Sequence, residues 1–242
     1  SGPARSDRYA QALLRNYLRE TEPAAKAPEV PARLEPTLHF PDSDDRGYPD
    51  LSFRVGRDKL YAVKNIENFL VNVEKRQTES YGKYLTLDHG IEQFDGRSQK
   101  LIHLLMNEFN RFRTVGDCAH WWNVDPFRRE KNKIALTGDA FDRFFDLWEG
   151  KCLETSAGDT VGCFREDPEV GLSVKKRDGG AELTIESDCT DVFFGSSRSL
   201  YALSRDNRLL RCSEEFRKKI YPLLKDGRET MFLAEQDLPA FC

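Results

Sequence analysis

Cys118 and His120 are residue types that nucleophilic catalysis uses, at a spacing that could bring them together. In a strand, residues i and i+2 point to the same face, so this thiol and imidazole can form a thiolate–imidazolium pair. The two side chains supply only half of a four-ligand zinc site, and no second Cys or His pair follows at zinc-binding spacing. The sequence therefore predicts no metal site. A thiol enzyme remains one alternative, which fast, pH-dependent alkylation of Cys118 would reveal.

The motifs of several common catalytic folds are absent from the sequence. It contains no GxxxxGK[ST] phosphate-binding loop, no GxSxG nucleophile turn and no HExxH zinc motif. Asp139, Asp142 and Asp146 lie along one expected helix, where none has a partner at the spacing of a catalytic carboxylate pair. We therefore expect no catalytic residue, no cofactor and no small-molecule substrate, and we interpret the chain as a non-enzymatic module.

Two basic clusters contain the candidate contacts to nucleic acid or to a partner protein. Tandem tryptophans in an expected loop can stack on bases or enter a partner's pocket, although large aromatic side chains are more often buried. Basic residues at the tip of one expected hairpin and in a neighbouring hairpin can contact phosphates, although such runs are usually solvated surfaces. The candidate residues are Trp121, Trp122, Arg128, Arg129, Lys175, Lys176, Arg177, Arg205 and Arg208.

The composition limits the classes of protein to which the chain can belong. A net charge of −4 and a pI of about 5.7 lack the basic excess that dedicated DNA-binding domains carry. No apolar run approaches the roughly 18 residues that cross a membrane, and the N-terminus lacks a signal-peptide pattern. The six cysteines form no CxxC pair, which favours reduced, core-filling thiols. We expect a cytoplasmic protein with no membrane partner.

Prolines and hydrophobic spacing divide the chain into three parts. Residues 1–22 are expected to form an N-terminal helix, because apolar residues recur there at helical spacing. Residues 23–32 are rich in proline and alanine, which predicts an extended linker. Residues 33–242 are expected to form the main domain, with a division into subdomains 33–150 and 168–242 as an option.

Two hairpins are the clearest elements of the main domain. Strict alternation at 51–55, a tight turn and a return strand at 59–63 predict the first hairpin, and Asn65 is expected to cap the helix that follows. Residues 170–176 and 181–187 flank an Asp-Gly-Gly turn and predict the second hairpin.

Capped helices account for much of the remaining main domain. Asp95, Thr137 and Ser213 are residue types that begin helices, and each precedes apolar residues at helical spacing. We expect one further strand at 80–87 and an irregular, glycine-rich segment at 150–168. Because the strand pairs are joined by short turns, we predict an α+β fold in which antiparallel β-hairpins have capped helices packed on one side.

The order of short motifs along the chain resembles the bacterial SNF2 helicase-associated domain. The motifs are RLEPTLHF at 33–40, LSFRVG at 51–56, KLYAVKNI at 59–66, YGK at 81–83 and LTGDAFDRFF at 136–145. The resemblance covers residues 33–150 well and residues 168–242 more loosely. These motifs are structural rather than catalytic, so they imply a fold and a context but no active site.

The resemblance implies that this chain is an accessory domain beside an ATPase motor domain. In the family, the domain lies between a SWIM-type zinc-binding region and a C-terminal SNF2-type ATPase, and this sequence contains neither the SWIM ligand pattern nor the ATPase motifs. The implied partner is the SNF2 ATPase region of the same polypeptide, with DNA as a second candidate. Because the chain stops at Cys242, just after an expected helix start at Asp237, we also expect it to be cut from a longer protein.

The function that we favour from the sequence is a non-catalytic accessory or regulatory domain of a bacterial SNF2-family DNA-dependent ATPase, which contacts DNA through basic loops or restrains the motor. The alternative is a protein-interaction module without nucleic-acid contact, which the net negative charge favours. Titration with DNA at two salt concentrations separates the two, because added salt weakens phosphate contacts.

Overall fold

The structure, a computed structural model, describes residues 30–40, 48–115, 130–136, 139–196, 198–224 and 228–234. Several expected features lie outside these residues. They are the N-terminal helix, most of the linker, Cys118, His120, Trp121, Trp122, Arg128, Arg129, the capping residue Thr137 and the helix start at Asp237.

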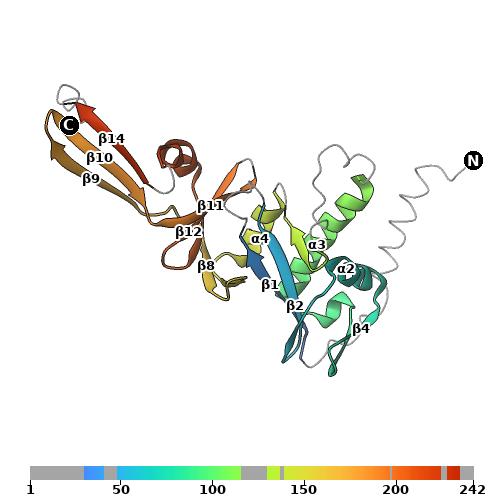
Figure 1. Ribbon diagram of the computed structural model, residues 1–242. Helices are drawn as coiled ribbons and strands as arrows, with labels where there is room; N and C mark the ends of the chain where they lie inside the picture. Colours follow the sequence, from blue (N-terminus) through green and yellow to red (C-terminus); the bar gives the residue numbers. More distant parts are fainter. Residues whose placement is uncertain are drawn as a thin grey trace, which may run out of the picture.

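A mixed sheet of nine strands forms the body of the protein (Figure 1). Its strands are β1 (Arg33–His39), β2 (Asp50–Gly56), β3 (Leu60–Ala62), β6 (Lys133–Ala135), β7 (Cys152–Thr155), β8 (Thr160–Phe164), β11 (Cys189–Ser196), β12 (Ser199–Ser204) and β13 (Arg208–Arg211). They follow the order β11-β12-β13-β8-β7-β1-β2-β3, and β6 also pairs with β2. One sheet therefore contains strands from both halves of the main domain.

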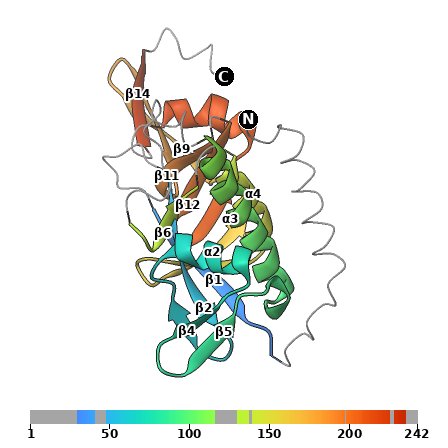
Figure 2. The same cartoon turned by 90° about the vertical axis from the view of Figure 1, so that its right-hand side faces the viewer.

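Alternating apolar residues turn one face of this sheet toward three helices. Leu34 of β1 lies opposite Val55 of β2, and Leu38 lies opposite Leu51, so all four side chains share a face, and all four are buried. Helices α2 (Ile66–Lys75), α3 (Gly96–Val115) and α4 (Ala140–Trp148) add their buried residues to the same core (Figure 2). The predicted α+β fold is confirmed.

Side-chain caps begin α2 and α3 at the expected places, whereas Asp139, which precedes α4, makes no side-chain cap bond. The side chain of Asn65 accepts a hydrogen bond from the N–H of Asn68 at 3.0 Å, and that of Asp95 accepts one from the N–H of Ser98 at 2.7 Å. Ser213 precedes a π-helical turn, η3 (Phe216–Ile220), which continues into a 3₁₀ turn, η4 (Tyr221–Leu223). No helix in the described ranges is long and apolar enough to span a membrane.

Two expectations about single segments are wrong. The segment at 80–87 is not one strand but most of a hairpin, β4 (Thr78–Tyr81) and β5 (Leu85–Asp88), which turns at Gly82 with a φ of +62°. The segment at 150–168 is not irregular, because it contains the β7–β8 hairpin. On its two outer sides this hairpin pairs with further strands in parallel, β7 with β1 and β8 with β13. Strands that are distant in sequence therefore stabilise the hairpin.

A second sheet projects from the body, away from α2 and β4 (Figure 1). It consists of β9 (Val170–Arg177), β10 (Gly180–Ser187) and β14 (Arg228–Ala234), in the order β14-β10-β9. We call this three-stranded sheet the arm. The predicted hairpin at 170–187 is confirmed, with Arg177 paired to Gly180 across a two-residue turn.

Candidate interaction site

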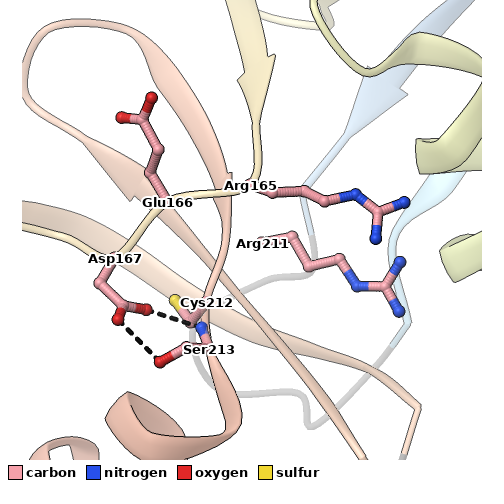
Figure 3. Close-up of a pocket in the computed structure, with 6 residues that line it drawn as sticks. All are labelled: Arg165, Glu166, Asp167, Arg211, Cys212 and Ser213. Carbon is pink, nitrogen blue, oxygen red and sulfur yellow. Dashed lines mark hydrogen bonds between the residues drawn. The ribbon is translucent and has the colours of Figure 1, made fainter.

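An open pocket of about 350 Å³ lies beyond the ends of β8 and β13 (Figure 3). It is lined by Arg165, Glu166, Asp167, Arg211, Cys212 and Ser213. The carboxylate of Asp167 accepts hydrogen bonds from the N–H of Ser213 at 2.6 Å and from its hydroxyl at 2.7 Å. The Ser213 oxygen in turn accepts a bond from the N–H of Phe216 at 3.0 Å. This wall of the pocket therefore caps the turn at η3.

The two arginines of the pocket extend side by side, away from Asp167 (Figure 3). Arg165 donates hydrogen bonds to Glu149 and to Asp146, each at 2.7 Å. Arg211 donates to the same Asp146 oxygen at 3.0 Å. Both guanidinium groups thus have carboxylate partners near the end of α4. A phosphate or carboxylate ligand would have to displace these partners, which argues against an anion-binding site here.

Asp142 extends the same acidic row one turn toward the start of α4. Its carboxylate accepts hydrogen bonds from the hydroxyls of Ser199 at 2.6 Å and Tyr201 at 2.7 Å, and Arg211 lies 3.7 Å away. Burial raises the pKa of Tyr201, and the bond to Asp142 raises it further. The acidic residues of α4, which had no catalytic partner in the sequence, therefore join this helix to β12 and β13.

The thiols of Cys163 and Cys212 are not activated. Burial raises the pKa of Cys212, in the pocket, to about 12, and it raises the pKa of Cys163 to about 12 as well. Both thiols are protonated at neutral pH and are therefore poor nucleophiles. Within the described ranges, no group of three His, Cys, Asp or Glu side chains could hold a metal ion. The thiol-enzyme alternative stays untested, because Cys118 and His120 lie outside these ranges.

Two of the arginines expected to contact phosphate are paired with carboxylates instead. Arg177 makes a bidentate contact with Glu182, with nitrogen–oxygen distances of 3.1–3.2 Å. Arg208 donates to Glu166, and its guanidinium lies 4.8 Å from the centre of the Phe164 ring. Each arginine would have to give up a salt bridge to bind a phosphate.

The remaining basic candidates do not form one continuous surface. Lys175 and Lys176 are exposed near the tip of the arm, and neither forms an ion pair within the described part of the chain. Arg205 is exposed near the other end of β10, where its N–H donates to the Asp188 carbonyl at 3.1 Å. The eight residues of β10 separate the two places by roughly 25 Å.

The arm exposes a row of apolar side chains. Every residue of β9 is exposed, and Val170, Leu172 and Val174 have exposed fractions of 41, 64 and 62%. Because alternate residues share a face, these three side chains form one row, with Ile185 opposite Leu172 and Leu183 opposite Val174. An exposed apolar row of this kind is typical of a contact surface for another molecule.

Sequence reasoning found the β9 strand but missed its exposed apolar face. The alternation of Val170, Leu172 and Val174 predicts that one face of the strand is apolar. It does not say whether other elements cover that face. The adjacent Lys175 and Lys176 were a usable indication, because lysines mark strands at a sheet edge.

Comparison with known proteins does not identify a family for this chain. The family therefore stays a prediction, which rests on the motifs at 33–40, 51–56 and 59–66. No family model, no curated protein and no solved structure matches the chain.

Proposed function

We propose that this chain is a non-catalytic accessory module of a bacterial SNF2-type DNA-dependent ATPase, and that it acts through protein contacts rather than through DNA. The motif resemblance supports the context. The exposed apolar row of β9 is the observation that carries the mode of action, because it offers apolar surface to a protein partner. The expected partner is the ATPase region of the same protein or a protein bound to it.

The charges of the described residues support this choice over DNA binding. Arg177 and Arg208 are held by Glu182 and Glu166, so their charge is already neutralised locally. The chain as a whole has a net charge of −4, which repels a polyanion. Among the described side chains of the arm, Lys175 and Lys176 are the basic pair that forms no ion pair, and two charges make a small electrostatic contribution to DNA affinity.

A DNA titration tests the mode of action. Fluorescence anisotropy with duplex and single-stranded DNA is measured at about 50 and about 200 mM salt. We expect weak binding at both salt concentrations, and no change in the double variant Lys175→Glu/Lys176→Glu relative to Lys83→Glu, which reverses an exposed charge far from the arm. Tight binding that salt weakens and that only the double variant abolishes would overturn the proposal.

The accessory role is tested in the parent ATPase. DNA-stimulated ATP hydrolysis is compared between the intact protein, a deletion of this module and the double variant Leu172→Asp/Val174→Asp. We expect the deletion to change the rate and the double variant to reproduce much of that change, because it makes the exposed apolar row polar without touching the core. Unchanged rates in both would contradict the role.

A further inference from the structure

We propose that the free edge of β9 binds an extended strand of a partner protein that has apolar residues at alternate positions and acidic residues toward the arm tip. The inference rests on the proposed function, since it requires a protein partner. β9 lies at the end of the arm sheet, with β10 on one side and no strand on the other among the described residues. Such an edge presents unpaired N–H and C=O groups that a further strand can use.

The hairpin geometry decides which backbone groups face outward. Arg177 and Gly180 close a two-residue turn, and the closing pair of such a hairpin exchanges hydrogen bonds. Because hydrogen-bonded and non-bonded pairs alternate, Val170, Leu172 and Val174 fall at non-bonded positions, and their N–H and C=O groups turn away from β10. The exposed apolar row and the free backbone groups therefore belong to the same residues.

The side chains of β9 specify the sequence of the added strand. On one face of the sheet, residues of the added strand would lie beside Leu172 and Val174 and extend their row, so these residues should be apolar. Lys176 ends that row, and Lys175 lies on the opposite face, so acidic residues should stand across from both. The chemistry of β9 thus selects a strand with apolar residues at alternate positions and carboxylates toward the arm tip, one across from Lys175 and one that ends the apolar row across from Lys176.

A second copy of this chain is a poorer occupant. The sequence of β9, VGLSVKKR, contains three positive side chains and no acidic one. Pairing two β9 edges would add the positive charges of both strands with no carboxylate on either edge to compensate them. Lysines placed in this way are a common protection of edge strands against self-association.

Binding of synthetic peptides to the full chain tests the inference. The probe is a fluorescent peptide of about nine residues in which valine alternates with aspartate or glutamate and the last valine position, expected across from Lys176, is also acidic. One control peptide has the same composition with its valines and acids in separate blocks, and a second carries N-methyl groups on every valine. We expect only the alternating peptide to bind, with an affinity that decreases as salt is added. The N-methylated control should fail because N-methylation removes the N–H groups that face β9.

Protein variants locate the binding edge. Val174→Pro removes an outward N–H, which an edge strand tolerates, and should abolish binding, whereas Val174→Thr keeps the N–H and should bind within a few fold of the wild type. Lys175→Glu/Lys176→Glu should weaken binding at least about tenfold, and Lys83→Glu should leave it unchanged. Circular dichroism checks that each variant is folded. If Val174→Pro fails to fold, the charge-reversal pair and the N-methylated peptide still decide the result.

The outcomes separate this inference from the proposed function. If the alternating peptide binds no better than its controls, strand addition is wrong, while the ATPase and DNA experiments still judge the accessory role. If the chain instead forms a concentration-dependent dimer that Val174→Pro abolishes, β9 pairs with a second copy and the proposed occupant is wrong. Binding that is equal in wild type and in Lys175→Glu/Lys176→Glu overturns the acidic character of the strand.

Discussion

At the scale of single residues, His89 shows how burial controls a titratable group. The ring is fully buried, with Nδ1 2.7 Å from the Gln77 carbonyl and Nε2 2.8 Å from the Tyr81 hydroxyl. A proton on Nδ1 satisfies the carbonyl, and the neutral Nε2 then shares the single hydroxyl proton of Tyr81 with the Glu79 carboxylate, which lies 3.1 Å from that hydroxyl. Desolvation lowers the pKa of His89, although the Gln77 carbonyl and the nearby Glu79 raise it in part.

This lowered pKa makes stability depend on pH. The unfolded chain takes up a proton near pH 6.5, the ordinary value, whereas the folded protein does so only at lower pH. The contribution of His89 is therefore fully present above about pH 6.5 and is lost as the pH falls below it. We expect the free energy of unfolding, measured with urea between about pH 5 and 7.5, to fall more steeply with decreasing pH in the wild type than in His89→Gln. The difference in slope is at most about 1.4 kcal/mol per pH unit. Parallel curves for the two proteins would show that His89 does not contribute in this way.

At the scale of elements, close backbone contacts decide which glycines can be replaced. In the turn between β2 and β3, a Cβ on Gly56 would lie 1.9 Å from the carbonyl oxygen of Lys59. A Cβ on Gly96, the first residue of α3, would meet no atom within 4 Å. The backbone around Gly56 therefore leaves no room for a side chain, whereas the surroundings of Gly96 leave room for one, and the two glycines can be compared as a matched pair.

Alanine substitution tests this difference between the two glycines. Gly56→Ala must displace backbone in the first hairpin and should destabilise the protein by about 1–3 kcal/mol. Gly96→Ala should be neutral or stabilise by up to about 1 kcal/mol, because alanine favours the helix. Urea unfolding of the two variants and the wild type measures both effects. Equal losses in the two variants would show that the contact at Gly56 is relieved easily.

At the scale of the whole molecule, contacts between distant segments join the two halves of the main domain. The sheet runs from β3 at one edge to β11 at the other, and α4 is tied to β13 by the contact of Arg211 with Asp146, which are 65 residues apart. The arm is a separate sheet, and every residue of its edge strand β9 is exposed. The body should therefore behave as one unit, with the arm less protected.

Hydrogen exchange at increasing denaturant tests this view. Amides of β1 and β2 and those of β12 and β13 should exchange with a common free energy of opening, because they belong to one sheet. The outward amides of Leu172 and Val174 should exchange rapidly without denaturant. If the segment at 199–211 opened at clearly lower free energy than the segment at 33–56, the two halves would instead be independent subdomains.

The sequence by itself determined the local structure of this protein where neighbouring residues decide it. Asn65 caps α2 because its side chain reaches an N–H three residues away, and the hairpin at 170–187 forms around a short turn. Alternation at 51–55 indicated the buried face of β2 for the same reason, since the strand's own pattern supplies the information.

Only the tertiary structure decided the features that depend on partners distant in the chain. The β7 and β8 strands at 150–168 pair in parallel with β1 and β13, which no local pattern indicates. The carboxylate that binds Arg208 lies 42 residues away, so the sequence could give this arginine only as a candidate for phosphate. The row of Leu172 and Val174 is likewise apolar in any fold. It is exposed because the arm projects from the body, and burial depends on where all the other elements pack.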